Sequence, residues 1–315
     1  MVTNIFQFNW EVNLMVWIQA NIVNSPFMIK ICTLFTYIGE PIIGVVLIGI
    51  FYYGTNKKLG KYLGLNMLAT CVINPLIKNV FFRIRPYFVN DSIKCLKPVD
   101  SSADIYDIFA QGYSFPSGHT MSATSLFGTL AMYIKKKKTT ITACVLVLLV
   151  AFSRFALGVH YPTDVMVGAI AGLLVIIIYS KLSEKISEEK MMIASVIIFS
   201  IGLFYCKTND YYQLYGLFIG FVCACLFEKK YVNFRSTSNI IKIVIRIIFG
   251  TLVFLAINKG LKIPFSKEFL ESGSLLSNLV TMLRYGLGIF ATMAIYPFVF
   301  KYNVLKLDDK TKDGD

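Results

Sequence analysis

Long apolar segments separated by short polar loops dominate the sequence from residue 33 to residue 300. A helix needs about 20 apolar residues to cross a bilayer, within a range of roughly 17 to 25. On this criterion the pattern predicts membrane spans at residues 33–53, 62–82, 118–134, 139–157, 163–181, 191–206, 211–227, 240–257 and 279–300. The expected fold is therefore an all-α, polytopic transmembrane helical bundle.

Residues 5–31 depart from this pattern. Trp10 and Trp17 are mixed with polar side chains, and Pro26 interrupts the run. Because tryptophan prefers the headgroup zone of a bilayer, we expect an interfacial helix here rather than a further span. The predicted organisation has three parts, which are a membrane-associated N-terminal region (1–32), a core (33–185) and a C-terminal extension of four spans with a cytoplasmic tail (186–315).

The composition excludes several classes of protein. Of the 315 residues, 56% are hydrophobic and only 16% are charged, and the mean hydropathy is +0.64. A soluble protein normally has about a quarter charged residues, so soluble, disordered and disulfide-rich secreted classes are excluded. The net charge is +13, but the cations lie in loops between apolar runs, which suits anionic lipid rather than nucleic acid.

Lysine and arginine are distributed unequally between alternate loops, which predicts the orientation of the chain. The lysine-rich set includes the loop around Lys57, the run Lys135–Lys138, the linker 181–190 and the C-terminal tail. The poorer set comprises residues 83–117, 158–162, 207–210 and 258–278. The positive-inside rule places the first set in the cytoplasm and the second set outside it.

The chain contains only two histidines, and both fall at the outward ends of predicted spans. One belongs to the run Phe115-Pro116-Ser117-Gly118-His119. The other, His160, lies in the segment 153–164. A third segment, 78–86, ends the span 62–82 on the same side. Residues that are distant in sequence are therefore expected to meet at one membrane depth.

Three motifs can be written from these segments, namely Lys78-x6-Arg85-Pro86, Pro116-Ser117-Gly118-His119 and Ser153-Arg154-x5-His160-x3-Asp164. In this order and spacing they resemble the signature motifs of the type 2 phosphatidic acid phosphatase superfamily. The resemblance covers residues 33–181. It implies a six-helix-type phosphatase core, to which the C-terminal spans are an addition, and an activity on lipid phosphates that uses no metal and no cofactor.

The residue types suit phosphate chemistry without reference to the family. A phosphate ester is an anion whose transition state spreads charge over its oxygens, so positioned cations supply most of the catalysis. We expect Lys78, Arg85 and Arg154 to bind the phosphate. Ser117 and Gly118 begin the helix at 118–134, where free N–H groups and partial positive charge form an anion site.

Cleavage also requires a nucleophile and an acid. His160 is predicted to attack phosphorus and form a phosphohistidine, while Asp164 accepts a bond from its other ring nitrogen. His119 is predicted to protonate the leaving oxygen and then to activate water. The resemblance implies the same roles at these positions. Ser153 is expected to support Arg154 rather than to touch substrate.

Other features of the sequence have structural explanations. The three cations could anchor span ends by snorkelling, and Arg83 has no motif role. Glu40 either faces the site or caps a helix, and Gly216, Gly220 and Ala224 are typical of helix packing. Arg246 and Arg284 lie within predicted late spans, where charge indicates function by default. No chemistry is assigned to them.

The sequence thus predicts an integral protein of a bacterial plasma membrane that hydrolyses a lipid phosphate or pyrophosphate at the outer face. Undecaprenyl pyrophosphate, phosphatidic acid and phosphatidylglycerol phosphate are the candidate substrates. A lipid phosphotransferase would use the same site with another acceptor, and a haloperoxidase would use a similar one. A transporter or flippase is the alternative outside the enzymes.

Overall fold

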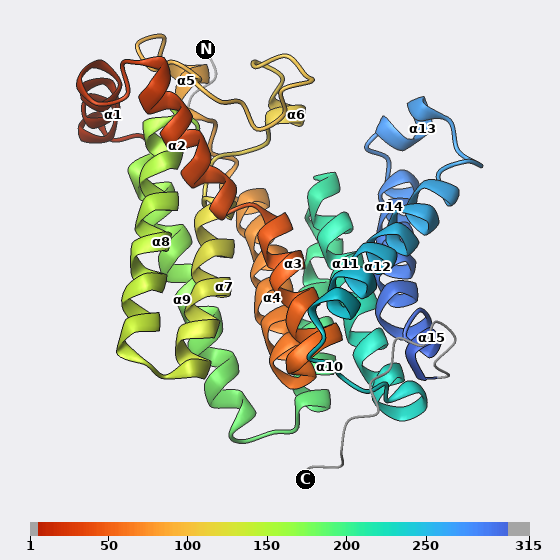
Figure 1. The fold of residues 1–315 in the computed structure, drawn as a ribbon. Helices are drawn as coiled ribbons and strands as arrows, with labels where there is room; N and C mark the ends of the chain where they lie inside the picture. The colour runs from red at the N-terminus through yellow and green to blue at the C-terminus, as the bar shows by residue number, and fades with distance from the viewer. Residues whose placement is uncertain (1–5, 302–315) are drawn as a thin grey trace. The chain divides into compact units, whose positions relative to one another are not determined.

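The computed structural model describes residues 6–301, and these contain helices and no strand. The predicted all-α fold is confirmed (Figure 1). The α-helices are α1 (Asn9–Asn21), α2 (Pro26–Ile38), α3 (Pro41–Ile50), α4 (Lys57–Phe81), α5 (Pro86–Val89), α6 (Ile108–Gln111), α7 (Gly118–Ile134), α8 (Lys137–Ala156), α9 (Pro162–Ser183), α10 (Glu188–Phe199), α11 (Asn209–Phe227), α12 (Ile240–Gly260), α13 (Lys267–Glu271), α14 (Leu275–Phe290) and α15 (Phe298–Lys301).

Six helical segments of the described chain are long and apolar enough to cross a membrane. They contain α4, α8, α9, α11, α12 and α14, and α2 with α3 makes a seventh if the bent pair counts as one span. Helix α7 has 17 residues. Three of the four predicted C-terminal spans, 211–227, 240–257 and 279–300, correspond to such segments, and 191–206 corresponds to α10 with the 3₁₀ turn Ser200–Phe204 that follows it.

The expected span 33–53 also differs in the structure. Its helix already begins at Pro26, and the chain breaks at Gly39 and Glu40 before α3 starts at Pro41, with a bend of 45° between the two helices. Proline lacks an N–H and clashes with the preceding turn, so it favours the start of a new helix over continuation of the old one. The apolar pattern alone does not register this break.

The described chain folds as two compact units. One contains the chain up to Gly44 together with Ile73–Lys181, and the other contains Val45–Val72 together with the chain from Leu182 onward. The division near residue 182 lies close to the expected boundary at 185. Residues 45–72, expected within the core, pack instead with the C-terminal helices, for example where Tyr53 donates a 2.6 Å hydrogen bond to the carbonyl of Thr292.

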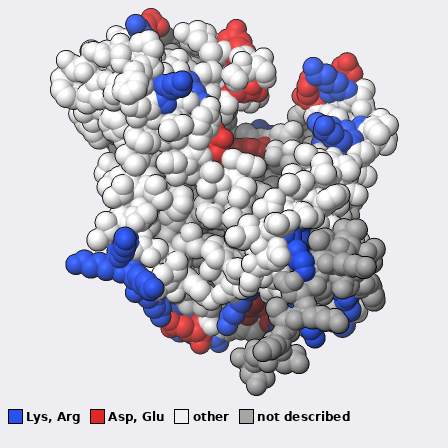
Figure 2. All heavy atoms as spheres, viewed as in Figure 1, with Lys and Arg blue, Asp and Glu red and all other residues white. Residues whose placement is uncertain are grey.

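In the first unit, α8 packs against α7, α2 and α1. Helices α7 and α8 are joined by a short basic turn, and Figure 2 shows its lysines projecting from the molecule. The short α1 lies over the opposite end of α8, where Met15 and Ile18 are buried against Tyr87, Ile93 and the segment 156–161. The tryptophans of α1 are about half exposed, at 49% and 56%.

In the second unit, α14 packs against both α11 and α12. The contact with α11 depends on two glycines, because a Cβ atom at Gly216 would lie 2.2 Å from the carbonyl oxygen of Met282, and one at Gly220 equally close to that of Gly286. Close backbone approach through small residues is the usual way in which helices associate in lipid. The packing role predicted for this series is confirmed.

Candidate active site

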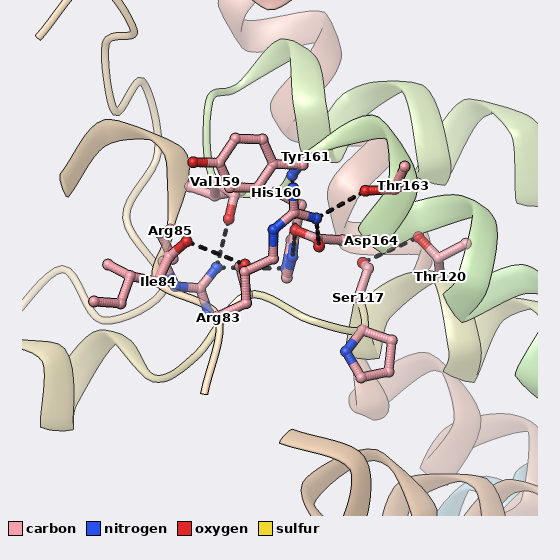
Figure 3. Close-up of polar contacts among 12 residues, drawn as sticks. Arg83, Ile84, Arg85, Ser117, Thr120, Val159, His160, Tyr161, Thr163 and Asp164 are labelled. Atoms are coloured by element: carbon pink, nitrogen blue, oxygen red, sulfur yellow. Dashed lines mark hydrogen bonds and ion pairs between the residues drawn. The ribbon is translucent and has the colours of Figure 1, made fainter. Parts of the chain in front are cut away.

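The motif residues meet at one end of the first unit. The end of α4 carries Lys78, the end of α8 carries Arg154, and His119 and Asp164 lie in the first turns of α7 and α9. His160 lies in the turn between α8 and α9. Each of the two histidines is within electrostatic reach of Lys78, Arg85 and Arg154. The structure thus brings together the three cations and two imidazoles that the sequence selects (Figure 3 draws part of this group).

Arg85 is anchored by backbone carbonyls. Its Nε donates to the carbonyls of Gln111 and Gly112 at 2.9 and 3.0 Å, and its Nη1 donates to that of Val159 at 2.7 Å. Nη1 also lies 3.4 Å from Nε2 of His160. No bond from Nη2 is found within residues 6–301, so Arg85 can offer this nitrogen to a phosphate oxygen while the rest of its fork is held.

Arg154 is held by a chain of hydroxyl groups. Its Nη1 donates to Thr36 Oγ1 at 3.3 Å, that hydroxyl lies 2.8 Å from Ser153 Oγ, and Ser153 donates in turn to the carbonyl of Val150 at 2.7 Å. The guanidinium is buried, and its Nε has no hydrogen-bond partner in the described structure. Ser153 therefore supports Arg154 indirectly, through a threonine that the sequence did not identify.

His160 is buried between a cation and a carboxylate (Figure 3). Burial, and then the neighbouring Arg85, Arg154 and Lys78, hold the pKa of His160 well below its ordinary value. The ring is therefore neutral at pH 7. An arginine N–H faces Nε2, which favours the tautomer with the proton on Nδ1, toward Asp164, and leaves a lone pair on Nε2.

Asp164 lies near His160 but does not form the expected hydrogen bond. Its Oδ2 is 3.5 Å from Nδ1 of His160, and that nitrogen has no hydrogen-bond partner in the described structure. Oδ2 accepts instead from the Tyr161 N–H at 2.7 Å. The pair is therefore a 3.5 Å contact in place of the expected hydrogen bond.

The turn that carries His160 requires a glycine. Gly158 has φ of +82°, a conformation that side chains other than glycine rarely adopt. A Cβ atom there would lie 2.2 Å from the carbonyl oxygen of Lys94. Gly158 therefore allows the loop at Lys94 to contact the turn between α8 and α9. This contact helps to set the position of His160, two residues further on.

The first turn of α7 supplies backbone donors beside the histidines. Ser117 is the N-cap and is fully buried, and its N–H donates to the carbonyl of Asp164 at 3.0 Å. Its hydroxyl accepts a bond from Thr120 Oγ1 at 3.1 Å (Figure 3). A Cβ atom at Gly118 would lie 3.3 Å from Asn74 Oδ1. The following N–H groups have no partner within the helix, so they can bind an anion.

A buried ionic chain that the sequence did not predict lies behind the site. Arg83 is completely buried, and its Nη1 donates to Asp164 Oδ1 at 2.6 Å while its Nη2 donates to Glu11 Oε2 at 2.7 Å. The guanidinium stacks on Tyr161 with its Cζ 3.8 Å from the ring centroid. Glu11, also completely buried, accepts from Thr163 through N at 3.0 Å and Oγ1 at 2.5 Å.

Glu40 is not part of this chain. It lies 3.5 Å from Lys97 in a partly exposed ion pair at the break between α2 and α3. Among residues 6–301, no three histidine, cysteine, aspartate or glutamate side chains gather as a metal site would require. The absence of a metal from the reaction stays a prediction.

The fold and the site define a class, which is an integral membrane protein with cations and histidines gathered at one end of a helical bundle. The chain belongs to the PAP2 superfamily. Residues 59–188 match "PAP2 superfamily", and residues 212–308 match "PAP2 superfamily phosphatase, transmembrane extension". The predicted family is confirmed, and the protein is a phosphatase.

Several curated proteins are similar to the first part of the chain. Phosphatidylglycerophosphatase B of Bacillus subtilis is 29% identical over 184 residues, which cover 54% of this chain and 82% of that protein. Undecaprenyl-diphosphatase BcrC of the same organism is 30% identical and covers 44% and 67%. Decaprenylphosphoryl-5-phosphoribose phosphatase of Mycobacterium tuberculosis is 30% identical and covers 51% and 84%. All three are named for phosphate removal from lipids.

Proposed function

We propose that the protein hydrolyses a lipid phosphate or pyrophosphate through a phosphohistidine. The observation that carries this proposal is the position of His119 and His160, each within electrostatic reach of the same three buried or half-buried cations. Cations gathered without equal negative charge attract an anion, and a neutral histidine among them can act as the nucleophile. The names of the similar proteins supply the lipid class of the substrate.

In the proposed first step, phosphate oxygens bind Lys78, Arg154, Nη2 of Arg85 and the N–H groups at the start of α7. The lone pair of His160 Nε2 attacks phosphorus and forms a P–N bond. The bond from phosphorus to the leaving oxygen breaks, and that oxygen takes a proton from His119, whose protonated, positively charged form is favoured by the negative charge of the bound phosphate. Asp164 stabilises the positive charge that develops on the ring of His160.

In the second step, the now neutral His119 removes a proton from water, and the resulting oxygen nucleophile attacks phosphorus. The P–N bond breaks, its electron pair returns to His160, and inorganic phosphate leaves. Arg83 acts as a positioning residue, because it holds Asp164 Oδ1 and so directs the other carboxylate oxygen toward His160. Glu11 holds Arg83.

The proposed location of the reaction is the outer face of a bacterial plasma membrane. The site lies where α4 and α8 end and α7 and α9 begin, which the distribution of lysine and arginine assigns to the outside. The candidate substrates are undecaprenyl pyrophosphate, phosphatidylglycerol phosphate and phosphatidic acid. The first two agree with the names of two similar proteins.

The test is release of phosphate from a panel of these three lipids by purified protein in detergent, with EDTA present throughout. We expect wild-type turnover on at least one lipid, and no turnover by His160→Ala or His119→Ala. The variants must elute as the wild-type protein does, so that loss of activity is not loss of fold. Wild-type turnover in either variant would overturn the assignment of roles.

Two rivals are separated by the same preparation. A phosphotransferase releases no phosphate from labelled lipid until an acceptor is added, and the label then appears on the acceptor. A transporter moves lipid across a vesicle membrane, and this movement survives His160→Ala. Free phosphate without any acceptor, together with loss of turnover in His160→Ala, supports hydrolysis over both.

A further inference from the structure

The second unit contains a polar cavity of about 470 Å³ between the start of α11, the segment around α13 and the middle of α14. Arg284 and Tyr285 of α14, Asn209 and Gln213 of α11, and Lys262 and Lys267 are among the residues that line it. All of them belong to one compact unit. Figure 2 shows lysine and arginine atoms beside acidic ones over the region of α13.

Arg284 is the unusual member of this group, because it is a buried cation without a carboxylate. It is 4% exposed and lies within the candidate span Leu275–Lys301, about 14 Å along the helix axis from Leu275. Its Nη2 donates to Asn258 Oδ1 at 2.7 Å, and its Nε lies 3.4 Å from the carbonyl of Asn258. Within the described chain, no acidic side chain approaches its guanidinium within 4.0 Å.

Two other buried charges of the described chain have partners of opposite charge, whereas Arg246 is held by backbone carbonyls, and Arg85 and Arg154 are held by carbonyls and a hydroxyl. Arg83 contacts two carboxylates, and buried Glu228 contacts Lys57 and Lys61 at 2.7 and 3.0 Å. A buried cation held only by an amide lacks the compensation that these groups have, and charge within a membrane segment is functional by default. Because Arg284 also lines the cavity, its positive charge is available to an anion that enters there.

The remaining groups of the cavity do not compensate Arg284. Glu271 lines the cavity but lies 3.8 Å from Lys267, with which it forms an exposed pair. Lys262 adds a further exposed cation. Asn258 has a buried amide nitrogen without a hydrogen-bond partner in the described structure, next to the guanidinium. Around Arg284, hydrogen-bond donors thus outnumber acceptors, and positive charges outnumber negative ones.

We propose that this cavity binds a phosphate group, either that of an anionic phospholipid headgroup or free inorganic phosphate. The guanidinium fork fits two phosphate oxygens, and the lysines add point charges above it. The amides of Asn209 and Gln213 can bind headgroup hydroxyls. The cavity lining contains no histidine or cysteine, and we assign binding alone to it.

The test compares four proteins, which are the wild type, Arg284→Gln, the double variant Lys262→Gln/Lys267→Gln, and Lys259→Gln as the matched control. Lys259 is exposed, follows Asn258 directly and does not line the cavity. The double variant changes only exposed side chains, so it keeps the proposal testable if Arg284→Gln fails to fold. The proposed active site is the same in all four proteins and contributes equally.

One arm counts phosphatidylglycerol molecules retained from nanodiscs by native mass spectrometry, with phosphatidylcholine nanodiscs for comparison. The other arm measures equilibrium binding of labelled inorganic phosphate in detergent. Loss of a charge-assisted bond weakens binding by about 10-fold to 100-fold. We expect this loss for Arg284→Gln and the double variant, and none for Lys259→Gln.

The arm in which the loss appears identifies the source of the phosphate, a lipid headgroup in the first and the free ion in the second. Binding equal to that of the wild type in Arg284→Gln and in the double variant, in both arms, overturns the proposal. Because binding and not turnover is measured, this outcome is independent of whether the proposed hydrolysis is correct.

Discussion

Replacement of Glu11 by glutamine tests the ionic chain behind the proposed active site. The carboxylate accepts from Arg83 Nη2 at 2.7 Å and from Thr163 through N at 3.0 Å and Oγ1 at 2.5 Å. An amide has one oxygen in place of two. If this oxygen keeps its hydrogen bond with Arg83, the amide nitrogen faces the Thr163 N–H. Two hydrogen-bond donors then lie against each other in the protein interior.

The expected loss follows from these contacts. A stranded buried donor costs about 1–3 kcal/mol, and replacement of a charge-assisted bond by a neutral one removes about 1 kcal/mol more. Arg83 keeps Asp164 as a partner, which limits the damage relative to a completely unpaired buried charge. We therefore expect Glu11→Gln to lower the free energy of unfolding by about 2–4 kcal/mol.

The chain offers a direct probe of this loss. Its only tryptophans, Trp10 and Trp17, both lie on α1, as Glu11 does. Unfolding in mixed micelles with increasing SDS can therefore be followed by tryptophan fluorescence, which reports on α1, and by circular dichroism, which reports on all helices. For Glu11→Gln, we expect the fluorescence transition to shift to lower SDS and to precede the loss of helix.

Glu40→Gln is the matched control, because Glu40 belongs to the same unit and its ion pair with Lys97 is partly exposed. Exposed pairs contribute at most about 1 kcal/mol. A double-mutant cycle with Arg83→Gln should show that the effects of Glu11 and Arg83 are not additive. A loss below about 1 kcal/mol for Glu11→Gln, or an equal loss for Glu40→Gln, would refute the reasoning.

Three further predictions concern activity. Burial and the neighbouring cations lower the pKa of His160, so its ring is still neutral at a pH equal to the ordinary histidine pKa of about 6.5. The acid limb of the pH profile of kcat/KM should therefore lie below this value. A limb at or above it contradicts the assignment of His160 as the nucleophile. Arg154→Lys, which loses the planar fork and the bond to Thr36, should lower kcat/KM at least about tenfold, as initial rates on the preferred lipid will show. Gly158→Ala should destabilise the protein by about 1–3 kcal/mol and reduce kcat, since φ is +82° there; wild-type thermal stability in detergent would count against this explanation.

The helices and the motif residues could be predicted because each depends on local sequence. The lengths of the apolar runs predict the positions of α4, α8 and α9 to within a few residues. The motifs lie at the ends of these helices on one side of the membrane, so they are expected to lie close together. The break at Gly39 and Glu40 was missed because hydropathy averaged over a whole span is barely changed by one Gly-Glu-Pro sequence. The 3₁₀ turn that ends the helix predicted over 191–206 was not foreseen, since an apolar run near the minimum length does not specify how tightly its last turn winds.

The chain from Glu11 through Arg83 to Asp164 could not be predicted in the same way. Its members are separated by 72 and 81 residues, and no periodicity links them. The only signals were a glutamate in the first turn of a largely apolar helix and an arginine without a motif role. Each of these suggests an anchor at the membrane surface when considered alone, and only the fold shows that they neutralise one another.

The ionic chain also has a consequence for the order in which the protein is assembled. Glu11 is synthesised 72 residues before Arg83 and 152 residues before Thr163, so its carboxylate acquires its native partners one after the other. The chain of contacts can close only after α9 has been made, because Thr163 and Asp164 lie in the first turn of that helix. The docking of α1 through Glu11 is therefore completed only after both of the segments that contact this carboxylate have been made.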